Sequence, residues 1–232
     1  MKKLVLIGGG EIGKGQTSYE TENIDKEIVK MSEKEHPNLL FIGLASSYSD
    51  SYYDLIKKIY KNLGCECAYL KKKNVINNPD IVKNKILNAD IIYIGGGDTI
   101  KLMEVVKEYE IDKLLKEAYE KGTVLAGISA GGILLSKEGY SDSLILRGES
   151  NNYTFIDGLG FTNISFCPHY NADEKKKNCL FNDLENSSKE VFGAENCSAI
   201  KIIDDKISVI KSNETANVWK IKFEKNIVEE KI

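Results

Sequence analysis

A serine between two glycines stands at the centre of Thr123–Ile133, where a short apolar run meets a glycine-rich turn. Thr123–Ala126 has the apolar composition of a buried strand, and Ile133–Leu135 suits the start of a helix. Ser129 and its flanking glycines match G-x-S-x-G, the nucleophile-elbow pattern, in which a tight strand-to-helix turn exposes the serine oxygen. The helix N-terminus would add its positive end at the same place. The alternative interpretation is an ordinary glycine-rich turn.

A serine nucleophile needs a base, and the chain has two histidines, His36 and His169. His36 is expected in a helix-to-strand turn at the opposite edge of the sheet, so the base should be His169, which follows the strand-like Asn163–Cys167. A third group should orient the imidazole. Glu195 is the first choice because it lies in a tight turn between two strands. Asp142 is the second, and residue types alone do not separate the two.

Two further glycine clusters follow apolar strands. Gly95–Gly97 precedes Asp98, a helix-capping residue type, and its exposed backbone N–H groups would suit an oxyanion hole. Gly8–Gly13 matches the dinucleotide-binding pattern G-x-G-x-x-G. However, the next helical pattern starts only near Glu22, and the second strand ends without an acidic residue for a ribose. Dinucleotide binding is therefore disfavoured.

The elements that must position these residues alternate along the chain. Strands are expected at 3–7, 38–44, 65–70, 90–94 and 123–126, and helices at 24–34, 54–63, 79–87, 100–109 and 111–121. This alternation predicts a doubly wound, mostly parallel sheet with helices on both faces, and such sheets carry their chemistry at the carboxyl ends of the strands. All three glycine clusters fall on that edge.

The second half of the chain has a looser pattern. Residues 136–157 are expected to be loops around the cleft, and a helix is expected at 174–184. Further strands are expected at 163–167, 190–192 and 198–203, with late antiparallel strands at 207–211 and 217–223. With no repeat or linker, residues 1–232 are predicted to form a single domain.

Composition excludes several classes of function. The net charge of −3 gives no basic surface for nucleic acid, and no apolar run approaches the roughly 18 residues of a membrane span. Residues 1–7 are expected to be the first strand rather than a signal peptide. The five cysteines are odd in number and irregularly spaced, which favours a reduced, cytoplasmic protein without structural zinc.

These motifs together make the chain resemble peptidase family S51, the dipeptidase E and cyanophycinase group of serine peptidases. The matching motifs occur in the family's order over nearly the whole sequence: LIGGGE at 6–11, IYIGGGDT at 92–99, GISAGG at 127–132, CPHY at 167–170 and GAEN at 193–196. The resemblance implies a class I glutamine-amidotransferase-like (flavodoxin-like) α/β fold and a serine peptidase that hydrolyses small peptides.

Site residues also follow from the resemblance. It implies a catalytic triad of Ser129, His169 and Glu195, and Asp142 roughly matches an aspartate that is functionally important in the family. The oxyanion hole would combine the N–H of Ala130 with one from the glycine triplet, at Gly96 or Gly97. The resemblance implies no metal and no cofactor.

Two departures from dipeptidase E concern specificity. Asp98 stands where that enzyme commonly has asparagine, and Lys175–Lys177 occupies a segment in which it has arginines. Arg147 is the chain's single arginine, so Asp98 and Arg147 are the expected substrate-binding residues. We expect an acidic or polar N-terminal substrate residue, with weaker charge discrimination than in dipeptidase E.

Two other functions are compatible with the sequence. A non-catalytic binding or sensor protein could use the same fold, because fold does not dictate function. A nucleotide-dependent oxidoreductase would rest on Gly8–Gly13 alone. The expected partner is a small peptide, without nucleic acid or membrane. The oligomeric state is open, with a homodimer as one option.

Overall fold

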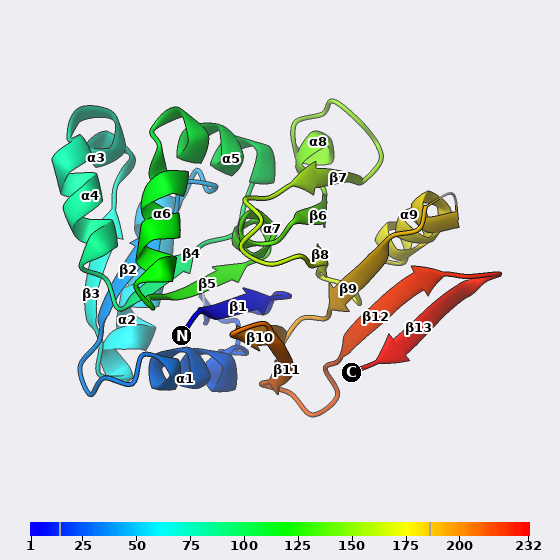
Figure 1. Ribbon diagram of the computed structural model, residues 1–232, viewed down its shortest axis with the longest axis horizontal. Coiled ribbons are helices and arrows are strands. Elements are labelled where there is room, and N and C mark those ends of the chain that lie inside the picture. Colours follow the sequence, from blue (N-terminus) through cyan, green and yellow to red (C-terminus); the bar gives the residue numbers. More distant parts are fainter. Residues whose placement is uncertain (14, 186) are drawn as a thin grey trace.

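A computed structural model describes residues 1–13, 15–185 and 187–232, and the strands of this part of the chain form two sheets (Figure 1). The larger sheet has the order β11-β10-β1-β5-β4-β2-β3. Its parallel strands are β1 (Lys3–Ile7), β2 (Asn38–Ile42), β3 (Glu66–Leu70), β4 (Ile91–Ile94) and β5 (Val124–Ile128). The antiparallel strands β10 (Ser198–Ile203) and β11 (Lys206–Lys211) extend one edge.

Helices cover both faces of the larger sheet. Leu4 and Leu6 of β1 face the layer of α4, α5 and α6, whereas Val5 and Ile7 face α1 and α2 (Figure 1). Because both faces are buried, the central strands are continuously apolar rather than alternating. The helices of these layers are α1 (Glu22–Met31), α2 (Ser49–Asn62), α3 (Lys72–Asn77), α4 (Pro79–Leu87), α5 (Thr99–Glu108) and α6 (Ile111–Glu120). The predicted doubly wound, mostly parallel α/β fold is confirmed.

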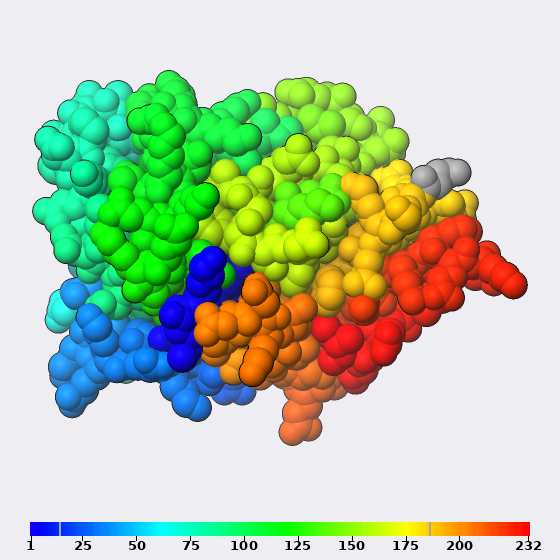
Figure 2. All heavy atoms as spheres, viewed as in Figure 1, coloured from blue at the N-terminus to red at the C-terminus, as the bar shows by residue number. Residues whose placement is uncertain are grey.

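The second sheet has the order β13-β12-β9-β8-β6-β7. Its strands are β6 (Glu138–Ser141), β7 (Thr154–Asp157), β8 (Ser165–Pro168), β9 (Glu190–Ala194), β12 (Val218–Phe223) and β13 (Ile227–Lys231). The remaining helices are α7 (Ala130–Leu135), α8 (Ser143–Leu146) and α9 (Glu174–Glu185). The β12–β13 hairpin projects at one end of the molecule (Figure 2).

Residues 136–157 were expected to be loops, and this expectation is wrong. The segment forms β6, α8 and β7. Its strands are four residues long, and β6 includes the buried carboxylate of Glu138, which accepts hydrogen bonds from Ser165 and Lys189. A short strand with a buried polar residue has no apolar alternation by which sequence reasoning could detect it. The helix expected to begin at residue 54 also begins earlier, with α2 starting at Ser49.

Parallel register brings the ends of β1, β5 and β4 together. Ile7 lies beside Ile128, and Ile94 lies beside Gly127. The turns that follow these strands therefore meet at one edge of the sheet, as predicted from their glycine clusters. Among the described residues, no helix has the length and apolar character needed to cross a membrane.

Candidate active site

Ser129 occupies a strained turn between β5 and α7. Its φ is 53° and its ψ is −115°, in a region that residues with a side chain rarely adopt. The Ser129 N–H donates to the Ile7 carbonyl at 3.0 Å, and its own carbonyl accepts from Ile133 N–H at 3.0 Å. These two bonds hold the turn between β1 and the first turn of α7. Ser129 is half-buried, so its side chain remains accessible.

The glycines on either side of Ser129 are required by close packing. A Cβ on Gly127 would lie under 3.0 Å from the backbone of Gly131, and a Cβ on Gly131 would lie equally close to the Ile94 carbonyl. Real Cβ atoms essentially never approach so closely. The G-x-S-x-G spacing therefore lets α7 begin directly against β4 and β5, which forms the sharp elbow.

The turn after β4 packs against the serine. A Cβ on Gly96 would lie 3.3 Å from Ser129 Cβ and 3.9 Å from its Oγ. The Tyr52 hydroxyl is in hydrogen-bonding contact with the Gly96 backbone. Gly97 has a φ of 140° and is exposed. Gly96, Gly97 and Ala130, the residues predicted for an oxyanion hole, thus all lie in the two turns that meet around Ser129.

His169 follows β8 in a second left-handed turn, with φ 72°. Its ring nitrogen Nδ1 lies 2.8 Å from Oδ1 of Asn196. The backbone N–H of His169 donates to the Ala194 carbonyl at 3.2 Å. With the amide oxygen as acceptor, the imidazole carries its proton on Nδ1, which leaves Nε2 as the basic nitrogen. Asn196 therefore orients the ring in the way that a general base requires.

Gly8–Gly10 packs against this histidine. A Cβ on Gly9 would lie under 3.0 Å from both Asn196 Oδ1 and His169 Nδ1. The Gly9 carbonyl also accepts from Cys197 N–H at 2.9 Å, so the loop fixes the turn that carries Asn196. These close approaches explain why Gly9 has no side chain. The glycine cluster makes room for His169 and Asn196, and this role accounts for it without a bound phosphate.

The Glu195 carboxylate has partners other than His169. Its Oε1 accepts from Trp219 Nε1 at 2.8 Å, and its Oε2 accepts from Asn217 N–H at 2.8 Å. These bonds join the turn after β9 to β12. The expectation that Glu195 orients the imidazole therefore differs from the observed contacts, in which Asn196 takes that position. Adjacent residues in an extended or turning chain point in different directions, and this local geometry was not readable from residue types.

Asp142 influences His169 without touching it. The Asp142 carboxylate is exposed at the residue before α8, and its negative charge is close enough to favour the protonated imidazole. Burial nevertheless lowers the pKa of His169 below its ordinary value, and the Lys176 cation lowers it further. The hydrogen bond to Asn196 and the Asp142 charge oppose these effects. The balance favours a neutral imidazole at neutral pH.

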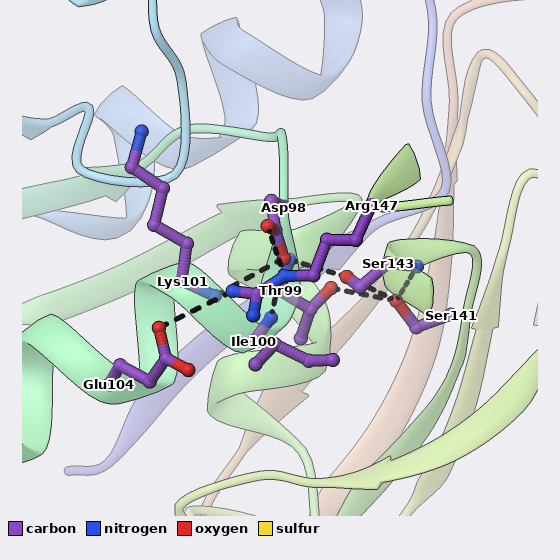
Figure 3. Close-up of polar contacts among 8 residues, drawn as sticks. All are labelled: Asp98, Thr99, Ile100, Lys101, Glu104, Ser141, Ser143 and Arg147. Atoms are coloured by element: carbon purple, nitrogen blue, oxygen red, sulfur yellow. Dashed lines mark hydrogen bonds and ion pairs between the residues drawn. The ribbon is translucent and has the colours of Figure 1, made fainter. Parts of the chain in front are cut away.

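Asp98 and Arg147, predicted to bind substrate, bind one another (Figure 3). Asp98 Oδ1 caps α5 by accepting from Ile100 N–H at 3.0 Å and Lys101 N–H at 3.2 Å. Its Oδ2 accepts from Arg147 Nε at 2.8 Å, and the guanidinium also reaches Glu104 at 3.3 Å. This cluster joins α5 to α8, and two carboxylates already share the positive charge of the guanidinium.

A parallel set of hydroxyl contacts supports the same junction. Ser143 Oγ accepts from Thr99 N–H at 2.8 Å, and Ser141 Oγ donates to Thr99 Oγ1 at 3.0 Å (Figure 3). Within the described residues, no group of three or more His, Cys, Asp and Glu side chains gathers in a way that could hold a metal ion.

Comparison with known proteins gives a consistent result. The family model for peptidase family S51 matches residues 4–210. The chain is 30% identical over 225 residues to the "uncharacterized peptidase YgaJ" of Bacillus subtilis, covering 95% of this chain and 92% of that protein. It is 23% identical to a "peptidase E" of a Nostoc species, covering 97% of this chain and 91% of that protein.

A solved structure shares the fold. The crystal structure of a peptidase from an acI-B1 Actinobacterium superposes with a TM-score of 0.74 at 22% identity, covering 100% of this chain and 94% of that one. The family match runs from β1 into β11 and includes the turns that carry Ser129 and His169. The chain therefore belongs to peptidase family S51, and it is a hydrolase of the serine-peptidase type.

Proposed function

We propose that this protein hydrolyses small peptides, with Ser129 as nucleophile, His169 as general base and Asn196 as the residue that orients the imidazole. The single observation that carries the proposal is the strained, left-handed backbone of Ser129 at the start of α7. Strain of about 1–3 kcal/mol at a non-glycine residue persists only where the surroundings enforce it, and such residues cluster at functional sites. The resemblance to dipeptidase E supports small peptides as the substrates.

The reaction proceeds by acyl transfer. Ser129 Oγ bonds to the scissile carbonyl carbon while its proton passes to Nε2 of His169. The imidazolium then gives that proton to the leaving amine as the carbon–nitrogen bond breaks, and an acyl-enzyme remains. Water attacks the acyl carbon with His169 again accepting a proton, and the carboxylic acid leaves as Ser129 recovers its hydrogen.

The oxyanion would be stabilised by backbone N–H groups of the two turns. Ala130 directly follows the nucleophile, at the position whose N–H serves in elbow-type hydrolases. Gly97 is the better second donor, because the Gly96 backbone already has a contact with the Tyr52 hydroxyl. Preorganised donors of this kind contribute about 3–4 kcal/mol each to transition-state stabilisation.

The proposal replaces Glu195 by Asn196 in the third catalytic position. The 2.8 Å contact between His169 Nδ1 and Asn196 Oδ1 supports it, as do the bonds of Glu195 to Trp219 and Asn217. A neutral amide fixes the tautomer but adds no negative charge beside the imidazolium. The exposed Asp142 carboxylate supplies a weaker, longer-range charge instead.

Serine labelling together with peptide hydrolysis tests the proposal. A fluorophosphonate should label the folded protein at Ser129, and Ser129→Ala should lose both the label and about 10⁴–10⁶ in kcat. Ser208→Ala, which removes an exposed hydroxyl on β11, is the matched control. Unchanged hydrolysis in Ser129→Ala would exclude the serine mechanism. Absence of labelling in the folded protein would favour a non-catalytic binding function.

A further inference from the structure

A cavity of about 210 Å³ lies at the carboxyl edge of the larger sheet, beside the candidate active site. It is lined by Gly10–Ile12 from the loop after β1, by Ser46 and Tyr48 from the turn after β2, and by Ser51, Tyr52 and Leu55 from α2. Pockets for whole drug-sized ligands usually measure roughly 300–1,000 Å³. The smaller volume here suits a single amino-acid side chain.

Two walls of the cavity continue into the two catalytic turns. Gly10 follows Gly9, which packs so closely on His169 that it has no room for a Cβ. On the other wall, the Tyr52 hydroxyl contacts the Gly96 backbone, and Gly96 packs on Ser129. Gly9 therefore separates the cavity from the base, and Tyr52 and Gly96 separate it from the nucleophile, so the cavity lies within a side chain's reach of both.

The described part of the lining is neutral except for one carboxylate. Ile12, Leu55 and the ring of Tyr52 supply apolar surface, and the tyrosine is held edge-to-face on Phe41 with ring centroids 5.0 Å apart. Glu11 is exposed and is the only charged side chain among the described lining residues. No lysine or arginine among them could neutralise an acidic side chain of a substrate.

A second carboxylate, that of Glu20, is bound to the backbone of Glu11. Glu20 Oε2 accepts from Glu11 N–H at 2.9 Å, and its Oε1 accepts from Ser18 Oγ at 3.1 Å. Both groups add negative charge on this side of the site. An acidic side chain entering the cavity would lose water without gaining a cation from the described lining, and burial of an unpaired charge is strongly unfavourable.

The cations predicted to recognise an acidic substrate lie outside the described lining of this cavity. Arg147 is paired with Asp98 and Glu104. Lys176 is 6% exposed and donates to the Pro168 carbonyl, while Lys177 pairs with Glu229 at 2.7 Å. Lys175 is exposed on α9, outside the cavity.

We propose that this cavity binds the side chain of one of the two residues flanking the scissile bond, and that it selects an uncharged side chain with an apolar body against an acidic one. The inference rests on the proposed peptidase function and adds its substrate class. Of the expected acidic or polar N-terminal residue, it keeps the polar option and replaces the acidic one. The side chain would pack on Ile12, Leu55 and the Tyr52 ring, and a polar tip would reach the hydroxyls of Ser46 or Ser51.

The sharpest test compares isosteric substrates. Two dipeptide series, Xaa-Ala and Ala-Xaa, are assayed with Xaa as Asn, Asp, Leu and Met. In the series whose Xaa enters the cavity, kcat/KM for Asn should exceed that for Asp by at least about tenfold, the factor for 1.4 kcal/mol. Leu and Met should be cleaved at least as well as Asn. An equal or higher kcat/KM for Asp in both series would overturn the proposal.

Reversing the charge of Glu11 tests whether this cavity is the pocket that selects the substrate side chain. Glu11→Lys should lower the Asn-to-Asp ratio by about three- to tenfold, because it removes one partly exposed negative charge and adds a positive one. Glu35→Lys makes the same change in net charge on the exposed turn before β2, at the opposite edge of the sheet, and should leave the ratio unchanged. Equal ratios in Glu11→Lys and the wild type would show that another surface selects the side chain.

A size variant provides a second criterion. Leu55→Trp should reduce kcat/KM for the Leu and Met substrates at least fivefold more than for the dipeptide Ala-Ala, since the larger side chain narrows the cavity. Uniform loss across side-chain sizes would contradict the proposal. If no dipeptide is hydrolysed and Ser129 is not labelled, the peptidase proposal itself fails. If peptides are hydrolysed without these preferences, only the assignment of the cavity fails.

Discussion

The amide oxygen of Asn196 lies 2.8 Å from Nδ1 of His169, and the neighbouring Glu195 points to Trp219 and Asn217. Two adjacent residues of one turn therefore divide two tasks between them. Asn196 sets the orientation of the imidazole, whereas Glu195 ties the turn to β12. Because the two side chains have different contacts, their substitution should have different consequences.

Asn196→Ala should lower kcat by about 10²–10⁴ with little change in KM, because the imidazole loses the partner that selects its tautomer. Asn196→Asp should keep substantial activity and move the pH midpoint of kcat/KM upward, since a carboxylate beside the ring favours the imidazolium. The pH profile distinguishes orientation from a general structural effect. If the pH midpoint of kcat/KM were unchanged in Asn196→Asp, Asn196 would not be the partner of the His169 imidazole.

Glu195→Gln should mainly affect stability. The substitution weakens the acceptors for the Trp219 indole N–H and the Asn217 N–H, and hydrogen bonds to a charged group contribute about 1.5–3 kcal/mol. Urea unfolding should therefore show a lower free energy of unfolding, while the kcat of the folded enzyme changes less than in Asn196→Ala. The opposite ranking of kcat would return the orienting role to Glu195.

The pH dependence of activity should reflect the environment of His169. Burial and the Lys176 cation lower the pKa of His169, so kcat/KM should rise through a midpoint below about 6.5, the ordinary value for histidine. Removing the cation in Lys176→Met should raise that pKa and move the midpoint to higher pH. Lys175→Met removes an exposed lysine from the same helix and serves as the control. Identical midpoints in the two variants would contradict this electrostatic role.

Asp25 should make stability depend on pH. Its side chain is buried and accepts hydrogen bonds from Tyr60 at 2.7 Å, Thr21 at 2.7 Å and Tyr19 at 2.9 Å. Burial raises the pKa of Asp25 to about 6, against the opposing effect of these hydrogen bonds. The folded state therefore binds this proton more tightly than the unfolded state. The resulting stabilisation is present below the unfolded pKa and is lost as the pH rises towards 6.

Comparison with Asp25→Asn isolates this effect. Between pH 4.5 and pH 7, the free energy of unfolding of the wild type should fall by about 2 kcal/mol relative to the variant. Asp54→Asn, which changes an exposed carboxyl on α2, is the matched control. Urea denaturation at several pH values measures the difference. A constant difference across this range would show that the carboxyl of Asp25 does not titrate as its burial requires.

The Asp98–Arg147 pair should contribute to structure rather than to specificity. Asp98→Ala removes the cap of α5 and should lower the free energy of unfolding by about 1 kcal/mol, with additional loss from the broken ion pair. Arg147→Lys should change KM for an Asp-Ala dipeptide and for an Asn-Ala dipeptide by the same factor. A selective rise in KM for Asp-Ala would instead support Arg147 as the anchor for an acidic side chain.

The sequence predicted much of the site because strand ends are readable. Apolar runs followed by glycines placed Ser129 and the Gly95–Gly97 turn at one edge of a parallel sheet, and a strand-like run placed His169 there as well. The choice between Glu195 and Asn196 depends on backbone angles within one turn. In the second sheet, the strands expected at 163–167, 190–192 and 217–223 correspond to β8, β9 and β12. The strands β6 and β7 were missed, since they have four residues each and form through pairing with other strands of the sheet.

Trp219 is the only tryptophan of the chain, and its indole bonds the residue adjacent to Asn196. The tryptophan fluorescence of the protein therefore comes from one emitter, attached to the turn that carries Asn196. Indole emission responds to the loss of a charged hydrogen-bond partner, so it reports on this turn without added dyes. Substrate titrations and stopped-flow mixing can thus follow the state of the site by a signal that no other tryptophan obscures.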